Sequence, residues 1–196
     1  DWPAAPDQVE AGGILIFEGR LKDLASQLGA FPLKAVLAPL PRQNQAFWTL
    51  SALWAGWLWG REAAAPFKSV LRRRRYDWSW HSAALYAALS SLSPNIPEGA
   101  PALGLIGEAE PGFLSAAMIA ADSAGFAARA VAMRHQDDQA QIHWVRAARP
   151  APTQPLDTAL LEQAAVAAAQ KLIQQRGEPC PYLPVHIAIL DELINT

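Results

Sequence analysis

Short apolar runs alternate with longer helical patterns through the first 126 residues of the chain. Three runs are short and rich in leucine, isoleucine or valine, which predicts buried strands over residues 14–19, 33–40 and 102–108. Apolar residues at helical spacing predict helices over residues 21–31, 46–64, 80–92 and 110–125, with Ser79 as the N-cap of the third. This order predicts an α/β fold with a Rossmann-like sheet of parallel strands flanked by helices.

The pattern changes after residue 126. Residues 128–135 and 141–147 alternate between apolar and polar positions around a polar QDDQ turn, which predicts an antiparallel hairpin at an edge of the sheet. A proline-rich stretch follows, and helices are predicted over residues 156–175 and 183–193.

These patterns divide the chain into three parts. Residues 1–12 are a polar, proline-bearing N-terminal arm, residues 13–149 an α/β domain, and residues 150–196 a linker with a helical C-terminal extension. The extension has two interpretations. It resembles the opening of a helix-turn-helix module, or it is a docking hairpin that buries an alanine-rich face on the α/β body.

Composition narrows the class of protein. The chain has 196 residues, 52% of them hydrophobic, which is enough for one domain with a core. Its net charge of −2 provides no global attraction to nucleic acid or to an anionic membrane. One cysteine, Cys180, excludes an internal disulfide framework and fits a cytoplasmic protein. The start of the sequence lacks both an initiator methionine and a signal-peptide pattern, so we expect a segment of a longer protein.

The proline-rich turn that ends the second predicted strand is the first candidate site. In α/β domains, ligands bind just beyond the carboxyl ends of the strands. The candidate pocket therefore includes the prolines that stop the strand and the polar and aromatic residues that follow, namely Pro39, Leu40, Pro41, Arg42, Asn44 and Phe47.

Residues 17–50 and 102–147 carry a family resemblance. FEGRLKDLASQLGAFPLKAVLAPLPRQNQAFWTL and the later strand, helix, AGF turn and hairpin resemble class I, S-adenosylmethionine-dependent amino-methyltransferases that act on DNA. The resemblance spans roughly residues 14 to 147. It implies a methyltransferase sheet that ends in an antiparallel hairpin, S-adenosylmethionine as cofactor, and nucleic acid as substrate. It also implies that the turn after the second strand holds the target base.

Two departures from the family pattern predict impaired or incomplete catalysis. In the family, a (Asp/Asn/Ser)-Pro-Pro-aromatic turn holds the target amino group, but the positions around Pro39 offer no such acceptor. The family also has a glycine-rich cofactor turn, and no GxG occurs in this chain. Glu18 and Gly19 are the cofactor-binding candidates, with Glu18 on a ribose hydroxyl. The alternatives are a non-catalytic interaction module, or a pseudoenzyme that binds nucleic acid.

Two further clusters have both a functional and a structural interpretation. Arg72, Arg73, Arg74 and Arg75 could contact phosphates, or they could complement a helix dipole and solvate a loop. The predicted helix over residues 46–64 carries four tryptophans and no charge before Arg61. It is too short to span a membrane, and we expect it to pack in the core, against the rest of a larger parent protein, or against a second copy.

No metal site is predicted. Asp137 and Asp138 lie between His135 and His143, but turn chemistry explains consecutive aspartates without a metal. No serine or cysteine stands in a nucleophile motif, so acyl transfer is not expected either.

Overall fold

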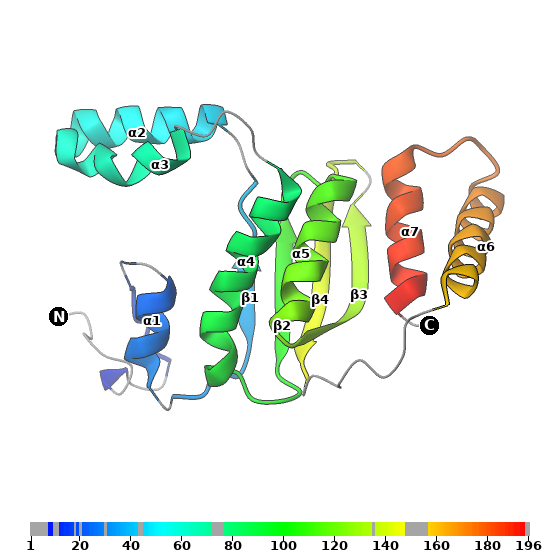
Figure 1. The fold of residues 1–196 in the computed structure, drawn as a ribbon, viewed down its shortest axis with the longest axis horizontal. Coiled ribbons are helices and arrows are strands. Elements are labelled where there is room, and N and C mark those ends of the chain that lie inside the picture. Colours follow the sequence, from blue (N-terminus) through cyan, green and yellow to red (C-terminus); the bar gives the residue numbers. More distant parts are fainter. Residues whose placement is uncertain are drawn as a thin grey trace.

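A computed structural model of the chain describes residues 8–9, 12–17, 19, 21–29, 31–42, 45–71, 77–134, 136–147 and 157–194. Figure 1 shows a central sheet with helices in front of it and at both sides. The four strands are β1 (Val36–Pro39), β2 (Pro101–Ile106), β3 (Phe126–Arg134) and β4 (Gln139–Arg146). The α-helices are α1 (Leu21–Leu28), α2 (Gln45–Trp59), α3 (Lys68–Leu71), α4 (Trp78–Leu92), α5 (Pro111–Ser123), α6 (Thr158–Arg176) and α7 (Tyr182–Ile194).

The sheet is mixed, in the order β1-β2-β4-β3. Strand β1 runs parallel to β2, with Val36 opposite Ala102, while β4 is antiparallel to both β2 and β3. The predicted mixed α/β architecture and the antiparallel hairpin at the sheet edge are therefore confirmed. A register shift between Ala128 and Ala130 marks a bulge in β3, and bulges of this kind bend a strand and increase its twist.

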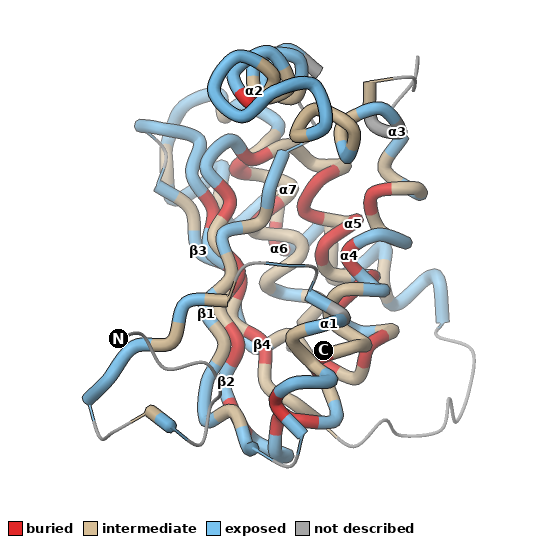
Figure 2. The backbone as a smooth tube through the Cα atoms, turned by 90° about the vertical axis from the view of Figure 1, so that its left-hand side faces the viewer, coloured by how far each residue is buried: buried red, intermediate tan, exposed pale blue. Residues whose placement is uncertain are grey.

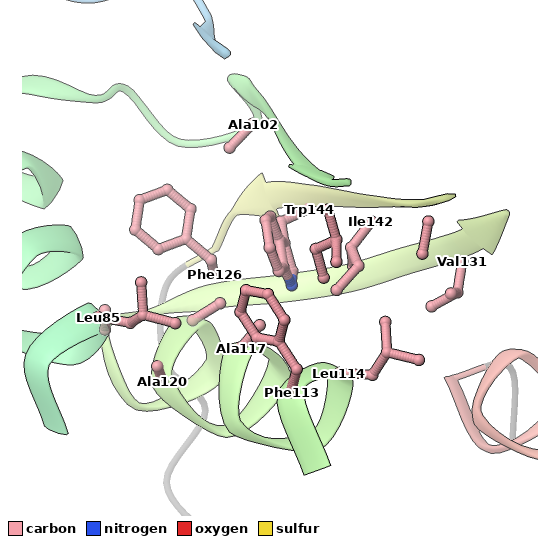
Figure 3. Close-up of a cluster of buried hydrophobic side chains, with 14 of the residues drawn as sticks. Leu85, Ala102, Phe113, Leu114, Ala117, Ala120, Phe126, Val131, Ile142 and Trp144 are labelled. Atoms are coloured by element: carbon pink, nitrogen blue, oxygen red, sulfur yellow. The ribbon is translucent and has the colours of Figure 1, made fainter. Parts of the chain in front are cut away.

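Helices cover one face of the sheet and form the core with it. Alternate residues of β2 and β4 point to this face, with Ala102 opposite Trp144 and Ile106 opposite Ala140. The side chains of α5 meet them, and Phe113 is fully buried. Figure 3 shows Phe113 pointing from α5 towards Trp144 in the sheet. The same cluster takes in side chains of α1, α4 and α7, so four helices share one core.

The opposite face of the sheet lacks such a cover. Residues that alternate with the core positions point to it, and none of those in the described strands is buried: Leu37, Leu103, Leu105, Gln141, His143, Val145, Ala127, Ala130 and Ala132. Leu37 of β1 is 68% exposed. Figure 2 shows β1 and β3 on one side of the molecule and α1, α4 and α5 on the other.

The tryptophan helix ends earlier than predicted. Gly60 has a φ of 88°, a left-handed value that glycine adopts without a steric penalty. The chain turns there and continues as a 3-10 helix, η2 (Arg61–Phe67), that packs back on α2. Figure 1 shows α2 and α3 beyond the end of the sheet. Among the described side chains of α2, only Ala55 is buried, so the helix is covered on one side rather than on several.

The C-terminal extension is a helical hairpin that docks through its second helix. Helix α7 packs on β3 and α5 and buries Ile187, and Asp191 accepts a hydrogen bond of 3.2 Å from the N–H of Val131. The alanine-rich helix α6 packs on α7, so the expected burial of its alanine face on the α/β body is wrong. The apolar side chains of α7, and not those of α6, pack against the core beside the sheet. Residues 150–156, the predicted linker, lie outside the described residues.

Two further sequence-based assignments are wrong. Residues 14–17 form no strand, because their backbone pairs with no described strand; Leu15 and Phe17 line a groove beside β1, while Ile14 and Ile16 are exposed. Helix α4 begins at Trp78 rather than Trp80, since Asp77, not Ser79, is its N-cap. The Asp77 carboxylate accepts a 2.6 Å hydrogen bond from the N–H of Trp80.

Candidate binding site at the ends of strands β1 and β2

The turn after β1 lies beside the loop after β2. The N–H of Leu40 donates to the carbonyl of Leu105 at 2.8 Å, which extends the pairing of the two strands by one residue. Two residues later, the guanidinium of Arg42 donates to the carboxylates of both Glu108 and Glu110. The carboxyl ends of parallel strands meet at the same edge of a sheet, and this cluster occupies that edge.

The two carboxylates are site residues that sequence reasoning missed. They belong to the segment GEAEP, residues 107–111, which overlaps the end of the strand predicted over 102–108 and directly follows β2. Once the two strands are known to be parallel neighbours, a polar segment after each of them is a signal for one shared site. The hydrogen-bond acceptors of this edge are therefore Glu108 and Glu110, which lie in the loop after β2 and not in the turn after β1.

The charges of this cluster hold each other in place. The hydrogen bond to Glu108 raises the pKa of Arg42 further above the physiological range, in which an arginine is always protonated. Arg42 and Glu108 are both more than a third exposed, and water screens their attraction. The cluster is therefore a positioned surface network rather than a source of stability.

A groove of about 830 Å³ runs along β1 from this cluster. Helix α1 with Leu15 and Phe17 forms one wall, β1 the second, and one side of α4 the third. Arg42, Trp48 and His81 line it at the carboxyl end of β1, while Leu92 and Phe31 line its other end. Nearly all lining residues are apolar, and the volume matches pockets that hold small molecules or an extended peptide segment.

Gly104 allows the sheet to close beneath the site. A Cβ added at this position would overlap the ring of Trp144 and lie 3.2 Å from Cδ1 of Leu40. Because Gly104 has no side chain, the ring of Trp144 can lie over this position of β2 and the side chain of Leu40 can approach it. This close approach links the position of the turn to the packing of the core.

An aromatic cluster supports the groove from the side of α4 and α5. Trp78 stacks on Phe113 with ring centroids 5.5 Å apart, and His81 meets Phe113 edge to face at 5.0 Å. His81 is 5% exposed, and burial lowers its pKa, which favours the neutral imidazole. Its Nε2 atom makes no hydrogen bond within the part of the chain that the structure describes.

The structure brings together some of the sequence-predicted site residues. Pro39, Leu40, Pro41 and Arg42 line the groove. Phe47 lies on α2, is 57% exposed and does not line it, whereas the neighbouring Trp48 does.

Other candidates from the sequence lie away from the groove or beyond the described residues. Gly19 is exposed and lies against the ring of Phe17. Three of the predicted contacts cannot be placed: Glu18, Asn44 and the run Arg72–Arg75 lie outside the described residues.

Among the described residues, no group of three or more histidine, cysteine, aspartate or glutamate side chains is placed to hold a metal ion. In the same part of the chain, none of the helices has both the length and the hydropathy required to cross a bilayer.

No protein-family model, curated protein or solved structure matches the chain.

Proposed function

We propose that this chain is part of a methyltransferase-like domain, related to S-adenosylmethionine-dependent DNA amino-methyltransferases, and that it is catalytically impaired or incomplete on its own. The observation that carries the proposal is the placement of the Pro39–Arg42 turn. It lies at the carboxyl ends of two parallel strands, next to a groove, in a sheet that ends in an antiparallel hairpin. The family resemblance implies this combination, and the sheet order supports it.

The open edge of β1 supports incompleteness. Among the described strands, β1 pairs with β2 alone, so its other edge faces the groove. The N–H of Leu40 points to β2, so the N–H of Leu37, three residues earlier, points to the open side. Exposed strand edges are templates for a further strand. The sheet therefore has a place for the strands on which a glycine-rich cofactor turn would be carried.

The state of the carboxylates supports impaired catalysis. A methyltransferase of this family needs an acceptor for the target amino group at the turn. Glu108 and Glu110 are the acceptors closest to this role, but Arg42 engages both of them. Arg42 cannot accept a hydrogen bond itself. Each carboxylate uses one oxygen on Arg42 and follows β2, so the described part of the turn after β1 shapes a pocket but carries no acceptor side chain of its own.

Binding and transfer of the cofactor separate this proposal from its rival. With millimolar S-adenosylmethionine, we expect a small rise in the midpoint of thermal unfolding, because a ligand that binds only the folded state stabilises it. The substitution Glu18→Gln should remove this rise, and Glu178→Gln, at an exposed turn, should keep it. We expect no transfer of labelled methyl groups to DNA. Turnover at ordinary rates would contradict the impairment, and the absence of any midpoint shift would favour the rival function, a non-catalytic interaction module.

The rival function is a non-catalytic interaction module, and one observation favours it. Helix α2 exposes a large apolar surface, which monomeric proteins rarely do. Contact of Arg72–Arg75 with nucleic acid stays a prediction, as does a cytoplasmic location.

A further inference from the structure

Helix α2 has an apolar stripe on the side that faces away from the rest of the chain. Phe47, Leu50, Trp54 and Trp57 follow one another at spacings of three, four and three residues, which places them on one side of a helix. All four are between 55% and 76% exposed. Leu53 and Leu58 lie beside them, at 49% and 62% exposure. These six side chains are called the α2 seam below.

The opposite side of the helix is already occupied. Ala55 is buried there, and η2 packs back against α2. Ring contacts also tie the two segments together, since Trp48 lies 6.2 Å from Phe67 at the end of η2. The helix is therefore fixed on one side and presents the α2 seam on the other. Figure 1 shows that α2 lies beyond the end of the sheet, where a second molecule can approach it.

The size of the α2 seam matches one half of a stable interface. At the roughly 150–250 Å² that a large aromatic side chain buries, and somewhat less for leucine, the seam exposes on the order of 700 Å². Stable protein interfaces bury about 800 Å² on each partner. A patch of this size exceeds the few hundred square ångströms that most monomers leave exposed.

The chemistry of the seam points to another helix as its occupant. Spacings of three and four residues are those with which helices interdigitate at small crossing angles. Helix α2 has no charged residue between Gln45 and Trp59, so two copies can meet without repulsion between like charges. A helix that lies on a membrane surface carries lysine or arginine on its outer side, which α2 lacks.

We propose that α2 is a dimerisation helix and that its partner is α2 of a second copy of this chain, in antiparallel orientation. A two-fold axis near the middle of the seam pairs Leu50 with the partner's Trp54, and Phe47 with the partner's Trp57. Each contact then occurs twice, as a symmetric interface requires. The pairing places a large ring against a smaller side chain in the centre, which favours close packing.

Two neighbouring tryptophans provide a matched test. Trp57 lies in the α2 seam and Trp59 points to a different side of the helix, yet they are 76% and 74% exposed. Sedimentation velocity over a micromolar concentration series should show wild-type chain moving from 21.2 kDa to twice that mass. Trp57→Glu should raise the dissociation constant about 100-fold, because it removes the ring from both Phe47–Trp57 pairs and places a charge in each of these apolar contacts. Trp59→Glu should leave the constant almost unchanged.

Three results would overturn the dimer. The first is wild-type chain that stays monomeric at every concentration. The second is an equal loss of association in both glutamate variants, which indicates non-specific adhesion. The third is wild-type chain that remains monomeric in solution but floats with vesicles of phosphatidylcholine and phosphatidylserine, which assigns the seam to a lipid surface. Circular dichroism of both variants verifies that the exposed substitutions leave the fold intact. This inference is independent of the methyltransferase relation.

Discussion

Replacing Phe113 by alanine is expected to destabilise the chain by about 3–5 kcal/mol, the usual cost of truncating a buried phenylalanine. Phe113 is 0% exposed and lies between Trp78, His81 and the sheet, so the lost ring leaves a cavity that none of these side chains can fill easily. Urea denaturation followed by circular dichroism measures the change, which corresponds to a drop in melting temperature on the order of 10 °C.

Phe31 provides the control for this substitution. It is 49% exposed, so Phe31→Ala removes a ring that is already half in water. Its cost should be less than half that of Phe113→Ala. Equal costs for the two variants would show that Phe113 does not join α4, α5 and the sheet into one core.

Adding a single methyl group at Gly104 is expected to destabilise the chain by about 1–3 kcal/mol, the cost of overpacking a core. The new Cβ would overlap the ring of Trp144 and press on Leu40, so either the sheet or the turn after β1 must shift. Gly107→Ala is the matched control, since a Cβ there meets no atom within 4 Å and the residue follows the same strand. Equal unfolding midpoints for the two variants in urea would contradict the close approach of Trp144 to β2.

The helices and strands that were predicted correctly are those whose local order of apolar, polar and turn residues is enough to specify them. Helix α5 is a continuous run of helix-forming apolar residues, the β3–β4 hairpin alternates between apolar and polar positions, and both end at turn residues, such as Gly125 with a φ of 86°. Residues 14–17 look equally apolar, but a strand needs a neighbouring backbone to pair with, and none of the described strands provides one. Pairing is a property of the partner and cannot be read from the segment alone.

In the candidate site too, local features could be predicted from the sequence and contacts between distant residues could not. The turn was predictable because Pro41 ends the pairing of β1, but the prediction that Pro39 stops the strand was wrong. Pro39 is the last residue of β1 and its nitrogen lies on the open edge, where no N–H is needed for the pairing with β2. The ion pairs of Arg42 with Glu108 and Glu110 were not, because they join residues 66 and 68 positions apart. They follow only from the parallel alignment of β1 and β2, which brings the ends of both strands to one edge.

The sequence predicted that α2 is covered on more than one side, whereas the structure covers it on one side only. Its tryptophans indicate packing, but the sequence does not say whether the contact lies within the chain or with another molecule. Gly60 turns η2 back over one side, and the α2 seam stays exposed on the other.

The central claim is that β1 is the open edge of an incomplete sheet, and amide hydrogen exchange at Leu37 tests it most directly. The N–H of Leu37 points away from β2, whereas the N–H of Ala38 points towards it. Exchange measured residue by residue should show a fast Leu37 amide beside a slow Ala38 amide that is protected like Ile142 in β4. If the Leu37 amide is as well protected as the Ala38 amide, a backbone already pairs with this edge and the sheet has no place for further strands.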